Sequence, residues 1–517
     1  MMESMTVCGR LEERSRLHPE RVMYRVGEHV VTYGEMGRRA VDVAAGLTAA
    51  GLARGDRIAV LAEQTLQAWQ LIFGCARAGV VPVLLNFRLT PDELTFITAD
   101  GGCRMLLSTP LFGPLAAAIS VEPAVERQDL ASFISGCVGG EPPDVDVLGS
   151  DDLVQLYTSG TTGLPKGVRI THDNLWHLSQ AASSELAGFA ADSVHLVAAP
   201  LFHVAGYAYG LGGLATGSPS VLIPLFDPVA VVQAIETYRC TNSLLVPAML
   251  QAIVEHPGTG TADLSTMRGI LYGGSPMSEA LMRKVAGRFR CGLSQTYGLT
   301  ETSGFATLLR FDDHEAGMTA QPGSTEAARI ASAGYAVPGC EVAVVSEDGG
   351  MVGDGSPGEV VVRGPLVMAG SSNRPEANAA QLDSDGWFHT GDIGYLQDGY
   401  LFLVDRLNDM VVTKGENVFP GEVERVLAEH PAVLEVAVIG VPDEQFGERL
   451  SAVVVLRTGQ ALTVLEMQEF CRPHLAGFKI PRSLEIVAHP LPRTPSGKVL
   501  RRVVREPFWG GHDRQIH

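Results

Sequence analysis

The sequence predicts an α/β protein with a small barrel-like β unit and a smaller α+β domain at its C-terminal end. Up to about residue 335, apolar strand patterns alternate with helical patterns at the spacing of βαβ units, which form parallel sheets. From about 335 to 405 the pattern changes to short strands with two-residue alternation and Gly/Asp turns, which favours antiparallel pairing. A charged break, Asp405-Arg-Leu-Asn-Asp409, precedes further strands and helices. We therefore predict domains at 1–405 and 406–517.

The first 150 residues alternate between helix and strand. Thr32 and Glu35 have the spacing of a capping box, and the apolar residues that follow recur with a helical period. Residues 57–61 form a short apolar strand pattern, 66–79 a second helical pattern, and 80–85 another strand. This succession predicts parallel strands joined by helices.

The rest of the chain continues the alternation around one polar loop. A strand at 153–157 leads into the loop 157–168, and Thr171 is placed to cap the next helix, as Ser278 is for a later one. The other elements predicted before the β unit are strands at 193–199, 220–223, 242–247, 268–272 and 292–297 and a helix at 229–238. The later ones are strands at 341–345, 359–363, 400–404, 436–439, 452–456 and 484–487, with helices near 420–429 and 464–475.

Composition and charge limit the classes of function. The chain has 517 residues, of which 46% are hydrophobic and 19% charged, so it can build a large core. Its net charge of −19 disfavours nucleic-acid binding. An anionic substrate would need local positive groups to hold it against this overall field.

The cysteines and the N-terminus predict a cytoplasmic protein. The eight cysteines are scattered without a CxxC pair, which disfavours a disulfide scaffold or a zinc site and fits a reducing compartment. The N-terminus lacks the basic-then-apolar order of a signal peptide. Residues 196–226 carry no Asp, Glu, Lys or Arg, but prolines and glycines interrupt them. We therefore predict short buried elements there and no transmembrane segment.

The loop Tyr157-Thr-Ser-Gly-Thr-Thr-Gly-Leu-Pro-Lys-Gly-Val168 has the composition of an anion site. Its glycines allow close backbone approach, its hydroxyl groups can donate hydrogen bonds, and Lys166 adds a positive charge. An ordinary surface turn shares much of this composition, but the closely following lysine favours an anion. Leu-Pro separates Gly163 from Lys166, so the loop is not a Walker A motif. The predicted ligand is a nucleotide polyphosphate.

This loop is one of an ordered set that resembles a known superfamily. The set comprises 157–168, 200–206, 272–275, 295–301, 388–392, 405–424 and 491–501. Together these loops resemble the adenylate-forming superfamily of acyl- and aryl-CoA synthetases, luciferases and peptide-synthetase adenylation domains, over about residues 25–505. The segments Lys414-Gly-Glu-Asn-Val-Phe-Pro-Gly-Glu-Val-Glu and Leu-Pro-Arg-Thr-Pro-Ser-Gly-Lys498 look most like those of the CoA ligases.

The resemblance implies a fold and a two-step reaction. The implied fold is a large N-terminal domain of two α/β subdomains plus a small β-barrel, followed by a small mobile α+β domain. In the first step a carboxylate attacks the α-phosphate of ATP and gives acyl-AMP and pyrophosphate. In the second step the CoA thiol displaces AMP and gives the thioester.

The resemblance also implies roles for individual residues. Lys498 would bridge the carboxylate and the α-phosphate, which otherwise repel each other. Glu301 would ligate Mg²⁺, and Asp392 with Arg406 would bind the ribose. The implied nucleotide-site residues are Thr158, Ser159, Gly160, Thr161, Thr162, Gly163, Lys166, Gly273, Gly274, Ser275, Thr296, Tyr297, Gly298, Thr300, Asp392 and Arg406. Taken singly, Lys498 could be a solvated lysine, Asp392 a turn former and Glu301 a surface carboxylate.

The same resemblance assigns residues to the second step. The C-terminal domain would rotate about Asn408, where Asp or Lys is the commoner residue, and would bring the Gly415 loop to the acyl-AMP. Lys414 and Phe478 are the expected neighbours of CoA, although Lys414 could simply be solvated. His203 is either a core histidine or, as in the ligases, a catalytic residue that borders and gates the acyl site.

The substrate is predicted to be a hydrophobic carboxylic acid. The stretches expected to line its pocket are 203–213, 246–249, 273–275 and 298–305, and they contain no Arg or Lys for a second carboxylate. The glycines at 206, 210, 212 and 213 would leave room for a bulky or polycyclic acid. The expected partners are therefore this acid, ATP, Mg²⁺ and CoA, and the expected assembly is a homodimer.

Three classes of function follow. The first is a complete acyl-CoA ligase. The second is an adenylating enzyme that loads a carrier protein or performs one half-reaction only. The third is a binding protein that has lost catalysis, which the joint presence of Lys166, Glu301, Asp392, Arg406 and Lys498 disfavours.

Overall fold

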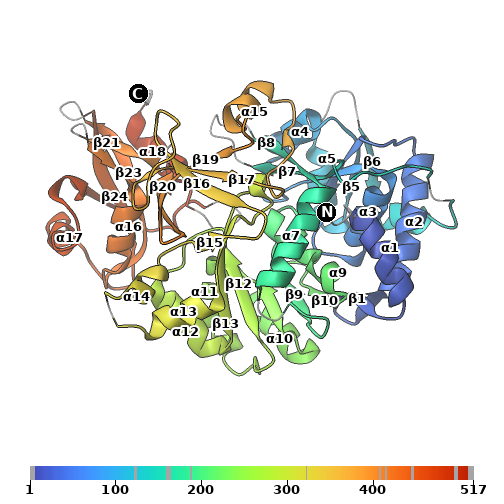
Figure 1. Ribbon diagram of the computed structural model, residues 1–517, viewed down its shortest axis with the longest axis horizontal. Coiled ribbons are helices and arrows are strands. Elements are labelled where there is room, and N and C mark those ends of the chain that lie inside the picture. The colour runs from blue at the N-terminus through green and yellow to red at the C-terminus, as the bar shows by residue number, and fades with distance from the viewer. Residues whose placement is uncertain are drawn as a thin grey trace. The chain divides into compact units, whose positions relative to one another are not determined.

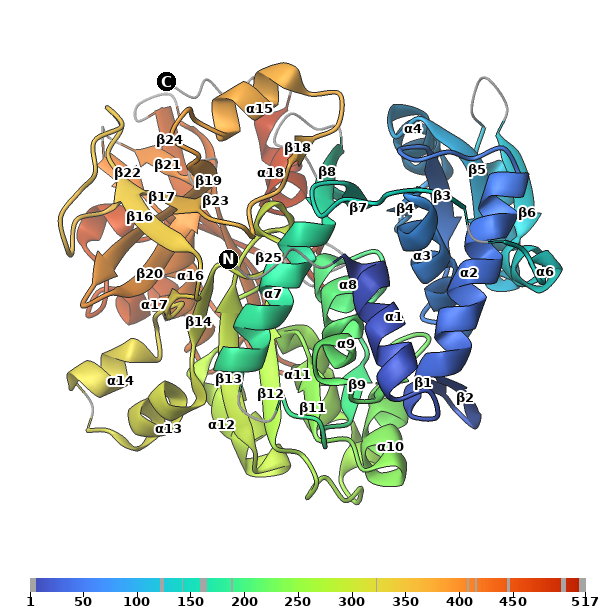
Figure 2. The ribbon, with the colours of Figure 1, turned by 45° about the vertical axis from the view of Figure 1, so that its right-hand side comes forward.

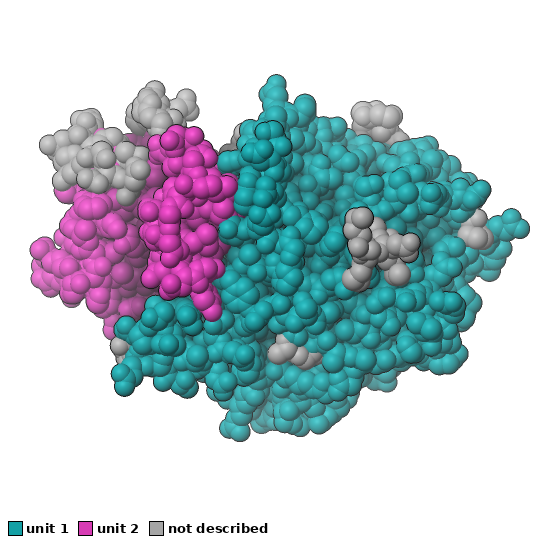
Figure 3. Space-filling model, viewed as in Figure 1, with its two compact units in different colours: residues 1–342, 362–389 teal, residues 343–361, 390–517 magenta. Residues whose placement is uncertain are grey.

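The computed structural model forms two compact units. It describes residues 6–120, 125–141, 143–158, 165–186, 189–321, 323–406, 409–413, 416–443, 447–493 and 499–510. The first unit comprises 1–342 and 362–389, and the second comprises 343–361 and 390–517 (Figure 3). The predicted division at 405/406 falls inside the second unit and stays a prediction.

A first sheet of the first unit carries the largest group of predicted site residues. Its strand order is β15-β14-β13-β12-β11-β9-β10-β1-β2 (Figure 1). The strands from β13 to β1 in this order pair in parallel, and β2, β14 and β15 pair antiparallel at the two ends. The strand bounds are β1 Val22–Val26, β2 His29–Thr32, β9 His195–Val197, β10 Ser220–Leu222, β11 Asn242–Leu244, β12 Gly269–Gly273, β13 Gly292–Tyr297, β14 Thr307–Leu309 and β15 Tyr335–Ala336.

The two faces of this sheet pack into different cores. Ile270 and Leu293 belong to a core that they share with apolar residues of α10, α11 and α12. Leu244 and Leu271 point to the other face and belong to a core that includes residues of α7 and α8. The helices on these faces are α7 His172–Glu185, α8 Val204–Gly210, α9 Gly212–Thr216, α10 Pro228–Tyr238, α11 Pro247–Glu255 and α12 Glu279–Phe289. Because both faces are covered, most residues of the central strands are buried, as in parallel sheets generally.

A second sheet holds the polar loop. Its order is β18-β8-β7-β4-β3-β5-β6, parallel from β7 to β6 and antiparallel at β8 and β18. The side chain of Asn378 exchanges two hydrogen bonds with the backbone of Ser371 and so holds β18. The strand bounds are β3 Arg57–Leu61, β4 Val81–Leu84, β5 Cys103–Ser108, β6 Glu126–Asp129, β7 Asp152–Thr158, β8 Lys166–Thr171 and β18 Gly370–Ser371.

Helices α1, α2 and α3 pack side by side in the first unit (Figure 2). The bounds are α1 Val7–Leu17, α2 Tyr33–Ala49, α3 Leu66–Ala78, α4 Pro91–Asp100, α5 Gly113–Ala118, α6 Leu130–Gly136, α13 Phe311–Thr319, α14 Thr325–Arg329 and α15 Pro375–Gln381. Thr32 and Glu35 form the predicted capping box of α2, and Thr171 and Ser278 cap α7 and α12 as predicted.

The second unit contains two further sheets. The sheet β16-β17-β19-β20 comes from the stretch predicted as a barrel-like unit, and β19 and β20 pair antiparallel. The last sheet has the order β22-β21-β24-β23, with β25 beside β24. The bounds are β16 Glu341–Val345, β17 Gly358–Arg363, β19 Phe388–Gln397, β20 Tyr400–Arg406, β21 Val411–Thr413, β22 Glu416–Val418, β23 Val433–Asp443, β24 Gly447–Leu456, β25 Ser483–Ile486, α16 Pro420–Ala428, α17 Val464–Cys471 and α18 Arg501–Trp509.

The uncharged segment 196–226 folds into short pieces of β9, α8, α9 and β10, as predicted. Over the residues that the structure describes, no helix has both the length and the apolar character needed to cross a membrane.

Candidate active site

The carboxyl ends of β12 and β13 bring predicted residues together at one edge of the first sheet. Gly273 and Thr296 are direct partners in the parallel pairing of these strands. A Cβ at Gly273 would lie 2.5 Å from the carbonyl oxygen of Thr296, so only glycine fits there. Gly274 follows with φ of 77°, which favours glycine, and its backbone is exposed. The chain therefore turns at the sheet edge with its peptide groups open to a ligand, at the place where open α/β sheets bind ligands.

A tight turn after β13 places Thr300 and Glu301. A Cβ at Gly298 would lie 2.4 Å from the backbone nitrogen of Phe305, so the turn closes directly on itself. The backbone N–H of Met368 donates to the carbonyl oxygen of Glu301 at 2.8 Å. The side chains of Thr300 and Glu301 are half-buried on this fixed backbone. Because β13 ends at Tyr297, both residues lie just beyond the same edge as Thr296.

The polar loop is held at both ends by a hairpin. Thr158 ends β7 and Lys166 begins β8, and the two are cross-strand partners. Below them, the hydroxyl of Tyr157 donates to Asp100 at 2.7 Å, and a Cβ at Gly167 would lie 2.3 Å from the side chain of Gln155. The hairpin thus fixes where the loop starts and ends. The predicted loop residues Ser159, Gly160, Thr161, Thr162 and Gly163 lie outside the described residues.

His203 occupies the N-cap position of α8, in the loop after β9, and its side chain makes no capping hydrogen bond. Its ring packs against Phe202 with a centroid distance of 4.6 Å. The buried Nε2 atom has no hydrogen-bond partner among the described residues. Burial, assisted by the nearby positive charge of Arg88, lowers the pKa of His203 to about 4. The imidazole is therefore neutral at physiological pH, with a polar atom still available for a ligand.

Asp392 and Arg406 belong to the second unit and are cross-strand partners in β19 and β20. Asp392 is 7% exposed, and its backbone N–H donates to the hydroxyl of Thr390 at 3.0 Å. Phe478 lies elsewhere in this unit, in a single turn spanning Gly477–Lys479, and is 37% exposed. The other residues predicted in this part of the chain, Asn408, Lys414, Gly415 and Lys498, lie outside the described residues.

The glycines of α8 and α9 were predicted to leave room for a bulky acid, but they lie against other parts of the first unit. A Cβ at Gly210 would lie 2.2 Å from the ring of Trp69, and one at Gly213 would lie 2.5 Å from the carbonyl oxygen of Ser218. A Cβ at Gly206 would lie 2.0 Å from the carbonyl oxygen of Pro200. These glycines permit close packing of the helices inside the first unit. The expectation that they open space for a bulky acid was therefore wrong.

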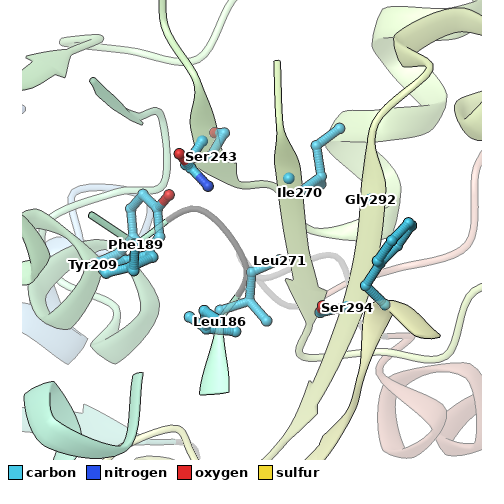
Figure 4. A pocket seen from close by; sticks show the side chains of 11 residues that line it. Leu186, Phe189, Tyr209, Ser243, Ile270, Leu271, Gly292 and Ser294 are labelled. Carbon is cyan, nitrogen blue, oxygen red and sulfur yellow. The ribbon is translucent and has the colours of Figure 1, made fainter. Parts of the chain in front are cut away.

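A pocket that the sequence did not reveal lies on the α8 face of the first sheet. Its cavity volume is about 20 Å³, which is about the room that one water molecule needs. Figure 4 shows Phe189 and Tyr209 on one side and residues of β11, β12 and β13 on the other. Leu271 and Ser294 each lie two residues before Gly273 and Thr296, so they occupy the same face about 7 Å below the edge. The lining residues are Leu186, Phe189, Tyr209, Asn242, Ser243, Gly269, Ile270, Leu271, Gly292, Ser294 and Phe311.

Comparison with known proteins connects this geometry to chemistry. Residues 11–371 match the family model of AMP-binding enzymes, and residues 422–498 match the model of the AMP-binding enzyme C-terminal domain. The chain is 40% identical over 503 residues to a feruloyl-CoA synthase of Amycolatopsis sp, covering 96% of this chain and 97% of the relative. It is 37% identical over 495 residues to the fatty acid–[acyl-carrier-protein] ligase ScoC of Streptomyces coeruleorubidus, covering 94% and 93%.

A solved relative shows what this fold can hold. The o-succinylbenzoate CoA synthetase of Bacillus subtilis, in complex with its acyl-adenylate intermediate, matches 98% of this chain and 99% of its own with a TM-score of 0.85 and 29% identity. The same synthetase has also been solved with ATP and a magnesium ion, and that structure matches 95% of this chain and 98% of its own with a TM-score of 0.83 and 30% identity.

Proposed function

The chain belongs to the family of AMP-binding enzymes, and on this premise we propose that it ligates a hydrophobic carboxylic acid to coenzyme A. In the first step a carboxylate oxygen attacks the α-phosphorus of ATP, and the bond to the bridging oxygen breaks to release pyrophosphate. In the second step the CoA sulfur attacks the acyl carbon and AMP leaves with the electron pair.

One observation carries this proposal: the ends of β12 and β13 place open glycine backbone beside two threonines and a carboxylate. Gly274 exposes its peptide groups to the adenine and the acyl carboxylate, and the half-buried Ser275 continues this surface, while the buried Gly273 allows the close approach of β12 to β13. Thr296 and Thr300 contribute hydroxyl groups to the phosphates. Tyr297 stacks on the adenine, and Gly298 closes the turn that presents these groups.

The β7–β8 hairpin supplies the pyrophosphate side of the site. Lys166 and Thr158 flank the loop and place a cation and a hydroxyl at its base. A glycine-rich loop held at both ends can direct several N–H groups to the β- and γ-phosphates. Lys498, in the C-terminal part of the chain, is proposed to bind the α-phosphate. Asp392 and Arg406 are proposed to bind the ribose.

Glu301 fits the requirements of a magnesium site. Mg²⁺ is usually held by one or two carboxylates together with substrate phosphates and water. Glu301 is a half-buried carboxylate on a fixed backbone at the sheet edge, and no cluster of three or more His, Cys, Asp or Glu is found among the residues with described positions. When bound, the ion would neutralise charge that develops on the phosphates.

We propose that the hydrocarbon part of the acid packs beside the loop that carries His203. His203 stands at the edge, at the start of α8, and remains neutral, so it borders the acyl group without pairing with a second carboxylate. We propose a hydrophobic acid, because the stretches expected to line its site contain no Lys or Arg.

The second step follows a rotation of the C-terminal domain about Asn408. This rotation withdraws Lys498 and brings the Gly415 loop to the acyl-AMP. Lys414 and the exposed ring of Phe478 then contact CoA. The neighbouring Lys479 forms an ion pair with Glu422 at 2.7 Å.

The second candidate function is transfer of the acyl group to a carrier protein. It is favoured by the resemblance to a fatty acid–[acyl-carrier-protein] ligase at 37% identity. Both candidates share the first step and differ only in the thiol that accepts the acyl group. An enzyme limited to one half-reaction would release pyrophosphate without forming a thioester, or would form the thioester only from supplied acyl-AMP.

We place the reaction in the cytoplasm and propose that the enzyme acts as a homodimer. All eight cysteines are free thiols, which fits a reducing compartment. The assembly is testable by light scattering of the purified protein, which would give twice the chain mass of 54.9 kDa for a dimer.

The test is to incubate the protein with ATP, Mg²⁺ and a panel of acids and to measure pyrophosphate and thioester separately. We expect pyrophosphate and CoA-thioester in equal amounts with the preferred acid. Release of pyrophosphate together with a thioester that forms on a carrier protein, and not on CoA, supports the second candidate. The variant Lys498→Ala should lose pyrophosphate release yet still convert supplied acyl-AMP and CoA to thioester.

A further inference from the structure

A cavity much larger than the pocket beside α8 lies between α1 and α2 in the first unit, and we call it the α1–α2 cavity. Its volume is about 370 Å³, which is within the range of ligand pockets. Helices α1 and α2 supply most of its lining and α3 contributes one residue; Figure 2 shows these three helices side by side. The described residues that line it include none of those assigned to the proposed active site. A ligand held there is therefore additional to the substrates of the ligase reaction.

Two glycines of α2 bring α1 and α2 close together. A Cβ at Gly37 would lie 2.5 Å from the hydroxyl oxygen of Ser15, and one at Gly34 would lie 2.9 Å from the carbonyl oxygen of Pro19. The contacts advance along α1 as they go back along α2, so the two helices are antiparallel. The residues that directly follow Ser15 and Gly37 therefore lie at the same level of the cavity.

The residues at that level are Arg16 of α1 and Arg38 of α2, and both line the cavity. Both are exposed, and neither side chain forms a hydrogen bond or an ion pair with any residue in the described ranges. A guanidinium group presents a planar fork of N–H donors that matches the oxygens of a carboxylate or a phosphate. In a chain of net charge −19, two unpaired arginines on opposite walls give a local attraction for an anion.

The floor of the cavity between this level and the start of α1 is apolar. Leu11 and Ala40 line it and are 2% and 3% exposed, and the half-buried Val41 follows Ala40 in the lining. Cys8 lines the far end, eight positions before Arg16 on α1, a separation of about 12 Å at about 1.5 Å per residue. The cavity thus combines one cationic end with an apolar floor that suits a medium-length alkyl chain.

The other charges of the lining compensate each other. Arg77 of α3 forms an ion pair with Glu12 of α1 at 3.4 Å. A polyphosphate would therefore find unpaired arginines at one end only. This distribution of charge fits a ligand with a single anionic group and a longer apolar part.

We propose that the α1–α2 cavity binds the anion of a medium-chain fatty acid, with its carboxylate between Arg16 and Arg38 and its alkyl chain along the apolar floor. The carboxylate accepts charge-assisted hydrogen bonds from the two guanidinium groups, and the floor removes the chain from water. The bound acid is a second ligand of the enzyme and is not activated in this cavity. Its binding does not depend on the chemistry proposed for the sheet edge.

The test uses Cys8 as a local reporter. Cys8 is a free, half-buried thiol that lines the cavity, so a ligand in the cavity should slow its alkylation by iodoacetamide, which mass spectrometry follows residue by residue. We expect decanoate, below its micelle concentration, to slow this alkylation severalfold. Decanol lacks the charge and butyrate lacks the long chain, so both should protect Cys8 much less. Cys291 is a half-buried free thiol outside the cavity and should react at an unchanged rate.

The double variant Arg16→Gln/Arg38→Gln should raise the decanoate concentration for half-maximal protection by about tenfold or more, because hydrogen bonds to charged groups are lost. Arg290→Gln is the matched control: Arg290 is exposed, lies in the same unit outside the cavity and has no partner in the described part of the chain. Calorimetry should find one decanoate site fewer in the double variant than in the wild type. Absence of protection by decanoate, equal protection by decanol, or equal numbers of sites in both proteins would overturn the inference, and none of these results bears on the proposed function.

Discussion

Gly273 illustrates how single atoms determine the geometry of the proposed site. A Cβ at this position would lie 2.5 Å from the carbonyl oxygen of Thr296, a contact that backbone atoms cannot relieve easily. We expect Gly273→Ala to push the ends of β12 and β13 apart and to lower kcat/KM for pyrophosphate release by about tenfold or more, because small displacements of a positioned substrate are costly. Steady-state kinetics with ATP and the preferred acid measures this effect.

Gly287→Ala is the control for that substitution. Gly287 is an exposed residue in α12, and a Cβ there meets nothing within 4 Å. The change should keep the activity and raise the free energy of unfolding by up to about 1 kcal/mol, because alanine is the better helix former. Equal losses of activity in both variants would show that the sheet edge has no special role.

Buried histidines predict a dependence of stability on pH. Burial lowers the pKa of His172 and of His195 to about 4, whereas an unfolded chain has a histidine pKa near 6.5. Between about pH 4 and 6.5 the unfolded state therefore binds more protons, and the free energy of unfolding rises with pH. The stabilisation is complete above pH 6.5 and is lost as the pH falls toward 4.

Substitution of His172 tests this dependence. His172→Gln keeps a side chain that can accept from the backbone N–H of Val7, which now donates to Nδ1 at 3.2 Å. It should reduce the slope of unfolding free energy against pH by up to about 1.4 kcal/mol per pH unit in this range. Urea unfolding at several pH values measures the slope. His177→Gln, at an exposed position of the same helix, should leave the slope as it is in the wild type.

At the scale of elements, an ion-pair network centred on Arg501 connects α18 to two other segments of its unit. Arg501 donates to Asp409 at 2.8 Å and to Glu424 at 2.8 Å, and Glu424 also accepts the backbone N–H of Val438 at 2.8 Å. The Arg501 side chain is 15% exposed, so these ion pairs are partly shielded from water. This network links Asp409, which follows the predicted hinge residue Asn408, to α18, which begins three positions after Lys498.

Arg501→Met should loosen that link. Because two carboxylates lose their partner in a partly exposed site, we expect a loss of about 1–2 kcal/mol of stability and faster hydrogen exchange in α18. Pyrophosphate release should fall by about tenfold, more than thioester formation from supplied acyl-AMP. The exposed Arg502 on the same helix provides the control variant Arg502→Met, for which neither rate should change. Equal pyrophosphate release in both variants would count against the link.

Local signals predicted some elements well and others poorly. Thr32, Thr171 and Ser278 were recognised as helix caps because a cap depends on residues only three positions apart. The glycines of α8 and α9 were misread as pocket residues because their neighbours, such as Trp69 beside Gly210, lie far away in the sequence. A local run of small residues does not indicate what its glycines face in the folded chain.

At the scale of the whole molecule, the two steps are proposed to need two arrangements of the same domains. Asn408, predicted as the pivot, tolerates unusual φ angles, as asparagine commonly does. Asn408→Pro would restrict φ and should reduce thioester formation by about tenfold or more while pyrophosphate release in a single turnover is retained. Rapid-quench kinetics separates the two events. Asn408→Gly, which keeps the conformational freedom, should support both, and similar losses in both half-reactions of the proline variant would refute the pivot.

The sequence by itself determined the family, the α/β class and the two-step ligase chemistry, because these depend on ordered motifs such as 157–168 and 491–501 that keep their meaning without coordinates. The roles of the predicted site residues remain predictions. Only the tertiary structure identified the small pocket between α8 and the first sheet, which Tyr209 lines. Its lining comes from segments separated by up to about 125 positions, from Leu186 to Phe311. Each strand contributes only alternate side chains to that face, so the packing of the chain, and not any local pattern, decides which residues line the pocket.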